Sequence, residues 1–169
     1  MEIECAKPGA WALTCVVALL VGGCRPEATG LRDGWIARDP DQRVAQLERQ
    51  LRGFDVAMLE TGHRYVELYW AGADANWEAA RYQVEKIRLA IENGLERRPK
   101  RGASARLFLE GPLAAMEQAI SAEDAGRFGT GFVDLTAGCN TCHAMERVAH
   151  FEVRQPLVRL SPIRRDGSG

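Results

Sequence analysis

The chain has 169 residues, a formal net charge of −1 and 46% hydrophobic residues. This length and composition predict one globular domain with a short appendage, and they exclude a wholly disordered chain. A net charge close to zero excludes a strongly basic nucleic-acid-binding protein, because such binding needs an excess of Lys and Arg. Aromatic residues make up only 7% of the chain, and runs of Val, Ile and Thr are scarce. The composition therefore favours helices over strands.

Residues 1–23 are predicted to be a lipoprotein-like signal peptide. Residues 10–23 form an uncharged apolar run that follows Lys7, which is typical of an export signal and short for a spanning helix. The string Val21-Gly22-Gly23-Cys24 resembles a lipobox. It predicts a lipidated Cys24 as the mature N-terminus, held at the periplasmic face of a membrane. A plain cleaved signal and an uncleaved anchor are the alternatives, and residues 24–40 are expected to form a tether.

The region after the tether predicts two helices joined by a turn. Apolar side chains at alternating spacings of three and four residues predict one long amphipathic helix over residues 41–71. This stripe comprises Val44, Leu47, Leu51, Phe54, Met58, Tyr65 and Leu68. Asn76 is the predicted cap of a second helix, which ends near Gly94. The basic run at residues 97–102 is expected to be a solvated loop, with a docking patch as the alternative.

Two further helices complete the predicted domain. Pro112 suits the first turn of a third helix. Its inward positions are Leu113, Met116 and Ile120. Ser121 and Asp124 predict the cap of a fourth helix. The apolar stripe of that helix comprises Phe128, Phe132, Leu135, Cys139 and Cys142. Residues 152–169, which turn polar and contain proline, are expected to form a C-terminal tail.

The string Cys139-Asn140-Thr141-Cys142-His143 carries the chemistry of the chain, because it matches the signature for covalent attachment of haem c. Thiols three residues apart on a helix face the same side, so each can add to one vinyl group of a porphyrin. The adjacent imidazole then lies where it can bind the iron axially. Of the five cysteines, only Cys139 and Cys142 belong to the predicted mature body.

The two thiols have three other interpretations. A zinc site needs four ligands, but the predicted mature body has no second pair of cysteines. The remaining histidines, His63 and His150, could complete such a site only by an accident of folding. A redox-active thiol pair usually opens a helix after a strand, and no strand is predicted here. A plain disulfide is the third alternative. Covalent haem agrees best with the predicted export, because the attachment is made outside the cytoplasm.

Four amphipathic helices with the attachment motif on the last one resemble the cytochrome c prime architecture. This resemblance covers residues 41–151 and implies an all-α, antiparallel four-helix bundle with one haem on the last helix. The residues Tyr69, Trp70, Ala71, Gly72, Asn76 and Trp77 also resemble a signature of an uncharacterised family of exported bacterial haem-c proteins. That second resemblance implies a fold and a cofactor, and it implies no activity.

The sixth iron ligand decides between the functions that remain. Met58 lies on the core stripe of the first helix, and a thioether ligand there would suit electron transfer. Counting along two antiparallel helices of 1.5 Å per residue instead brings Leu51 closest to the level of His143, which would leave the iron open. Met116 and Met145 are weaker ligand candidates. Arg147, one turn beyond His143, is a candidate partner for a haem propionate.

The sequence therefore predicts an exported mono-haem cytochrome c that transfers electrons to a redox partner protein. The alternative is a protein that binds small gas molecules, such as NO or CO, at an open sixth position. A peroxidase is disfavoured, because Glu60 and Arg64 lie off the buried stripe and make a poor acid–base pair. Membrane association through the lipid on Cys24 and a homodimer are the other expected interactions.

Overall fold

The computed structural model describes residues 35–164. The predicted signal peptide, Cys24 and most of the predicted tether lie outside the described residues. The chain divides into two compact units, Met1–Gln50 and Leu51–Gly169. Residues 35–164 form an all-α structure without a strand, so the predicted fold class is confirmed at that level. Within the same range, no helix combines the length and the apolar character needed to cross a membrane.

The predicted long helix over residues 41–71 is wrong, because the structure has two helices there. Helix α2 spans Pro40–Leu51, and helix α3 spans Phe54–Ala73. The chain leaves the helical conformation at Arg52, whose φ is 57°, and Gly53 is extended before α3 begins. The spacing of apolar residues continues across this break, so periodicity alone does not reveal it. On α2 itself, Leu51 is 58% exposed.

Helices α3 and α4 (Trp77–Arg97) form a hairpin that builds much of the core. The predicted cap of α4 is confirmed, because the Asn76 side chain accepts a hydrogen bond from the Ala79 amide at 3.2 Å. One residue of the resemblance between Tyr69 and Trp77, Gly72, has a packing role near this turn. A Cβ atom on Gly72 would lie 2.0 Å from Cζ of Phe128, so glycine is what lets the first turns of the last helix approach α3.

The third helical stretch begins earlier than predicted and contains Pro112 in its interior. It runs without a break through a 3₁₀ turn η1 (Pro99–Arg101), helix α5 (Gly102–Phe108), a π-helical segment η2 (Leu109–Leu113) and helix α6 (Ala114–Ser121). Proline has no amide hydrogen and clashes with the preceding turn of an α-helix. The wider π turn accommodates it. The inward positions Leu113, Met116 and Ile120 are confirmed as buried.

Helix α7 (Ala125–Met145) carries the attachment motif. Asp124 is confirmed as its cap, since its carboxylate accepts from the Arg127 amide at 2.9 Å. The amides of Arg147 and Val148 bond back to the carbonyls of Ala144 and His143, at 3.1 and 2.8 Å. Together with the positive φ of Arg147, 60°, this is the Schellman arrangement that ends a helix.

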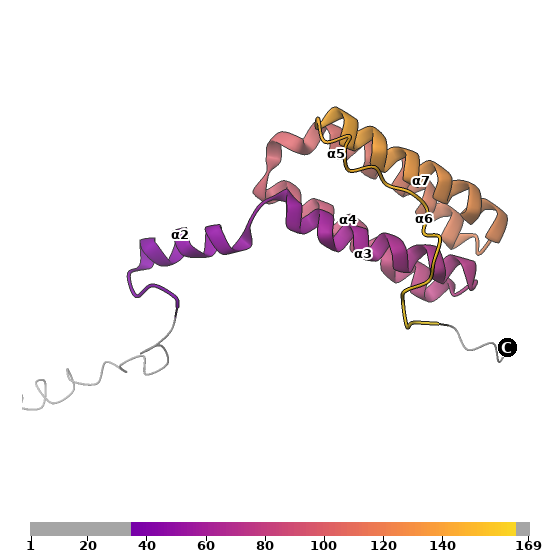
Figure 1. The fold of residues 1–169 in the computed structure, drawn as a ribbon, viewed down its shortest axis with the longest axis horizontal. Coiled ribbons are helices and arrows are strands. Elements are labelled where there is room, and N and C mark those ends of the chain that lie inside the picture. The colour runs from indigo at the N-terminus through magenta and orange to yellow at the C-terminus, as the bar shows by residue number, and fades with distance from the viewer. Residues whose placement is uncertain (1–34, 165–169) are drawn as a thin grey trace, which may run out of the picture. The chain divides into compact units, whose positions relative to one another are not determined.

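Helix α7 packs against α3, α5, η2 and α6, and α4 packs against both α3 and α6 (Figure 1). The largest side chains that these helices bury completely are Leu68, Val84, Ile87, Leu113, Met116, Ile120, Phe132 and Leu135. This core holds the attachment helix and α3 at a fixed register, which is what positions the site.

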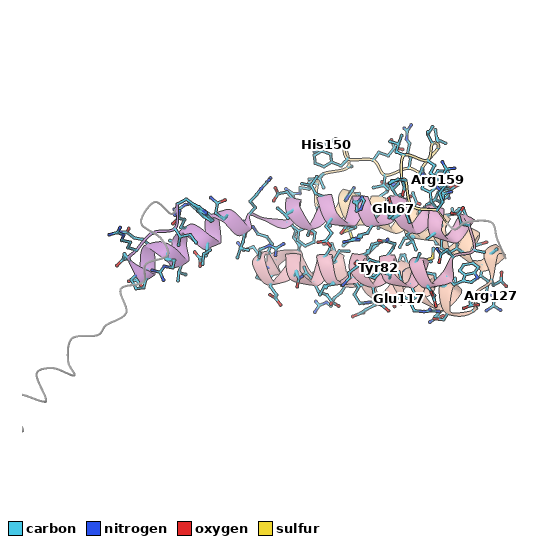
Figure 2. The ribbon with its side chains drawn as sticks, turned by 90° about the horizontal axis from the view of Figure 1, so that it is seen from below. Glu67, Tyr82, Glu117, Arg127, His150 and Arg159 are labelled. Atoms are coloured by element: carbon cyan, nitrogen blue, oxygen red, sulfur yellow. The ribbon has the colours of Figure 1, made fainter. Side chains whose placement is uncertain are left out.

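The segment after α7 returns over α3 as an extended chain (Figures 1 and 2). Arg159 forms an ion pair with Asp74 and lies 5.0 Å from the centroid of the Trp70 ring. Ser161 Oγ donates to the buried Glu67 carboxylate at 2.7 Å. The predicted tail is therefore attached to the helices as far as Ser161, and residues 165–169 lie outside the described range.

Candidate functional site

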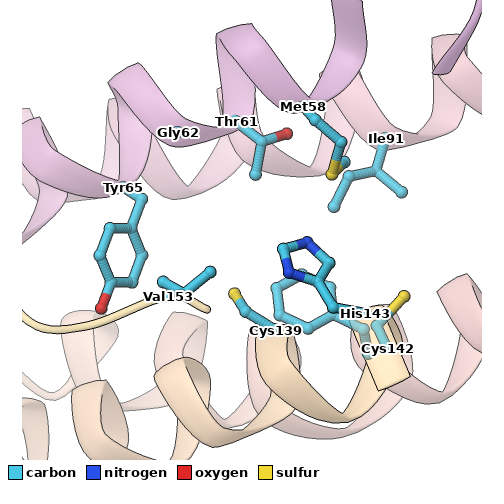
Figure 3. A pocket seen from close by; sticks show the side chains of 10 residues that line it. Met58, Thr61, Gly62, Tyr65, Ile91, Cys139, Cys142, His143 and Val153 are labelled. Atoms are coloured by element: carbon cyan, nitrogen blue, oxygen red, sulfur yellow. The ribbon is translucent and has the colours of Figure 1, made fainter. Parts of the chain in front are cut away.

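The attachment motif lines a cavity of about 110 Å³ between α3 and α7. Cys139, Cys142 and His143 enter it from α7, and Met58 enters it from α3. Figure 3 shows the sulfur atoms of the two cysteines on either side of the His143 ring, with the Met58 sulfur pointing toward them from the opposite helix. The structure thus brings together the predicted thiols, the predicted proximal imidazole and the predicted thioether.

Both motif cysteines are free thiols in surroundings that disfavour the thiolate. Burial, together with the neighbouring Cys142, raises the pKa of Cys139 to about 12. Burial also raises the pKa of Cys142, although its hydrogen bond with Ser104 acts in the opposite direction. The thiols therefore remain protonated at neutral pH, and they are poor candidates for a nucleophilic or thiolate-based redox centre.

His143 has a hydrogen-bond partner that no sequence signal identified. Its Nδ1 lies 2.6 Å from the backbone carbonyl of Phe151. A carbonyl oxygen only accepts, so Nδ1 must carry the proton, and the lone pair of the neutral ring is then on Nε2. A backbone acceptor of this kind fixes the ring and its tautomer, as is usual for a metal-binding histidine.

Met58, and not Leu51, lies at the level of His143. Three pairs of contacts define the register of the antiparallel α3 and α7. The close approach of Gly72 and Phe128, the 4.9 Å ring contact of Tyr69 and Phe132, and the 2.7 Å hydrogen bond of Tyr65 and Thr136 follow one another along the two helices. Met58 lies seven residues before Tyr65, and His143 lies seven residues after Thr136. The same register therefore places Met58 opposite His143.

The expectation for Leu51 is therefore wrong. Its count assumed that the first helix ends at residue 71 and that the fourth begins near Ala122. The structure ends α3 at Ala73 and begins α7 at Ala125. Each helix rises about 1.5 Å per residue, so these two shifts remove most of the offset between Met58 and His143.

Arg147 does not lie on the attachment helix, which corrects its predicted place one turn beyond His143. It follows the end of α7 and is exposed. Another cation lies nearer to the motif: Arg101 pairs with Glu146 at 2.5 Å, and Ser104, which is buried, also donates to Glu146. Sequence reasoning assigned Arg101 to a solvated loop, and nothing in the local sequence indicates its pairing with a residue 45 positions away.

The remaining ligand candidates lie outside the cavity. Met116 is fully buried in the core, whereas Met145 is 49% exposed at the end of α7. His63 is exposed on α3. His150 is also exposed, and it belongs to the segment after α7.

The donor set of the cavity fits a covalently attached haem. The two thiols could form thioethers, Nε2 of His143 could bind iron, and the Met58 sulfur on the opposite wall could be a further ligand. The cavity volume is below the roughly 300–1,000 Å³ typical of pockets that enclose drug-sized ligands. A porphyrin between α3 and α7 would therefore require these two walls to lie further apart. Among residues 35–164, no three His, Cys, Asp or Glu side chains lie close enough together to hold a metal ion by themselves.

No family model, no curated protein and no solved structure matches this chain.

Proposed function

We propose that this protein is an exported mono-haem cytochrome c that transfers electrons to and from a redox partner protein. The proposal rests on one observation above all: Cys139, Cys142 and His143 line the same cavity, and Met58 faces them from α3. The motif alone is a sequence pattern. Its place in a cavity that also contains the Met58 thioether agrees with an iron porphyrin held between two helices.

Four of the residues that line the cavity have definite tasks in this proposal. The Cys139 and Cys142 thiols hold the group covalently through its two vinyl carbons, and His143 binds through Nε2. Haem supplies a metal that changes its oxidation state by one electron without a change in the protein chain. Met58 provides a neutral thioether, which favours the reduced form and raises the reduction potential.

The helix arrangement supports a four-helix bundle as the fold of this cytochrome. Four helical stretches follow one another along the chain, namely α3, α4, the continuous α5–α6 stretch and α7, and the attachment motif is on the last of them. The opposite directions of α3 and α7 agree with an antiparallel four-helix bundle of the cytochrome c prime type.

A paired substitution tests the cofactor. Cys139→Ala together with Cys142→Ala should abolish haem that stays with the polypeptide after denaturation, while Thr141→Ala, in the same motif, should retain it. Thr141 is exposed, and its hydroxyl bonds only within α7, to the Ala137 carbonyl at 2.9 Å. Covalent haem in the double variant, or none in the wild type produced with a haem-attachment system, would contradict the proposal.

One observation favours a second function, the binding of a small gas molecule. Thr61 lines the cavity next to Met58, and its hydroxyl lies on the Met58 side (Figure 3). It is buried without a hydrogen-bond partner, and an unsatisfied buried hydroxyl costs about 1–3 kcal/mol. A polar diatomic molecule that displaced Met58 could accept its hydrogen. Carbon monoxide binding by the reduced wild-type protein would support this function over electron transfer.

A further inference from the structure

One of the two variable residues inside the attachment motif makes a specific tertiary contact. The Asn140 amide nitrogen donates to the Val153 carbonyl at 2.9 Å, and its amide oxygen accepts from the Val153 amide at 2.8 Å. A primary amide offers one donor and one acceptor side by side. It can therefore satisfy both backbone groups of a single residue, which is how Asn140 holds the returning segment against α7.

The held segment is the one that supplies the acceptor for His143. Phe151 is two residues before Val153, and its carbonyl lies 2.6 Å from Nδ1 of His143. On the other side, the Val148 amide donates to the His143 carbonyl at 2.8 Å, and the Phe151 amide donates to the Val148 carbonyl at 2.9 Å. Phe151 is thus fixed from both directions, by the end of α7 and by Asn140.

We propose that Asn140 is a positioning residue of the haem site: it holds the chain at Val153 so that the Phe151 carbonyl accepts a hydrogen bond from Nδ1–H of His143. The proposal rests on the proposed function of the cavity. A hydrogen bond at Nδ1 makes the imidazole a stronger donor to iron through Nε2. The segment after the motif is then part of the ligand sphere, and it tunes the reduction potential.

The contrast with Thr141 gives the proposal its specificity. Both residues separate the two cysteines, and both are polar. Thr141 is exposed and bonds only to its own helix, whereas Asn140 is partly buried and bonds to a residue 13 positions away. Position 140 should therefore require an amide, and position 141 should not.

The test compares Asn140→Leu with Thr141→Val in the full-length, haem-loaded protein. Leu keeps the size of the side chain and removes both hydrogen bonds. We expect unchanged covalent haem, amide hydrogen exchange at Val153 about tenfold faster or more, and a higher midpoint potential, because the weaker imidazole donor stabilises the oxidised iron less. Thr141→Val should match the wild type in all three measurements.

Asn140→Asp is the second variant, because its nearly identical shape protects against a failure to fold. The carboxylate still accepts from the Val153 amide but cannot donate to the Val153 carbonyl. It should lose part of the protection at Val153.

Two results would overturn the positioning role. One is wild-type protection at Val153 in Asn140→Leu, and the other is a wild-type midpoint potential although the segment is released. A wild-type protein without covalent haem would instead overturn the proposed function, and that measurement comes before any variant is compared.

Discussion

Tyr65 forms a directed hydrogen bond at the edge of the cavity. Thr136 Oγ1 donates to the Phe132 carbonyl at 2.7 Å, so the Tyr65 hydroxyl must be the donor in its own 2.7 Å bond to Thr136 Oγ1. Burial raises the pKa of Tyr65 from 10.0 to about 12. Ionisation is therefore less favourable in the folded than in the unfolded protein. The resulting stability is fully present below pH 10 and is lost as the pH rises toward 12.

Tyr65→Phe should isolate this effect. At pH 7 the variant should lose about 0.5–1.5 kcal/mol of unfolding free energy, the usual net value of one hydrogen bond, because Thr136 remains satisfied by Phe132. Between pH 10 and 12 the variant should lose less stability than the wild type. Denaturant unfolding at a series of pH values measures both effects. Equal alkaline losses in the two proteins would contradict the raised pKa of Tyr65.

Met58→Ala should separate the two functions of the cavity. If the thioether binds the iron, the variant loses the methionine charge-transfer band, has a lower midpoint potential and binds carbon monoxide. If it does not, the spectrum stays unchanged and the variant loses about 2–5 kcal/mol of stability, as for other core truncations. Met145→Ala, at an exposed site on α7, is the matched control and should change neither property. An unchanged spectrum with lower stability would reject the methionine-ligated electron carrier.

At the residue scale, the sequence predicts which side chains line the cavity better than it predicts which backbone groups bond to them. The spacing of Cys139, Cys142 and His143 identified three of the residues that line the cavity, and the apolar stripe identified Met58. The acceptor for His143 was not predictable, because the Phe151 carbonyl is a backbone group and carries no residue-type signal. The same holds for Asn140, whose role depends on where the segment after α7 returns.

At the scale of elements, the presence of helices was easier to predict than their boundaries. Helical periodicity correctly indicated helices and correctly indicated most inward positions. The ends were harder, because glycine is the usual signal for the left-handed residue that ends a helix. Here Arg52, Ala75, Glu123 and Arg147 have positive φ, and no glycine among residues 35–164 does. This explains why the break after α2 and the end of α7 were missed.

Two glycines on α7 should respond oppositely to the same substitution. A Cβ atom on Gly138 would lie 2.6 Å from Cγ of Pro112 in the π-helical segment, whereas a Cβ on Gly129 would meet nothing within 4 Å. Gly138→Ala should therefore destabilise the protein by about 1–3 kcal/mol, as overpacking does. Gly129→Ala should stabilise it by about 0.5–1 kcal/mol, since alanine is the better helix former. Thermal unfolding of both variants measures the difference, and a stabilised Gly138→Ala would contradict the close contact of α7 with η2.

At the scale of the whole molecule, the contacts that shape the cavity belong to the second unit. The three residue pairs that set the register, the hydrogen bond of Phe151 and the bonds of Asn140 all lie after Leu51. The described residues of the first unit, 35–50, contribute none of the residues that line this cavity. We therefore expect membrane attachment and haem binding to be separable properties of the chain.

Substitution of the proposed lipidated residue tests this separation. Cys24→Ser should abolish labelling of the protein with a radioactive fatty acid and move it from the detergent-rich to the aqueous phase on phase partition. Its haem spectrum and midpoint potential should equal those of the wild type, because no cavity residue changes. Cys15→Ser, a change within the predicted signal peptide, is the matched control and should keep the fatty-acid label. A labelled Cys24→Ser protein would reject lipidation at this residue. An altered haem spectrum in an otherwise folded Cys24→Ser protein would instead show that the first unit does contribute to the haem site.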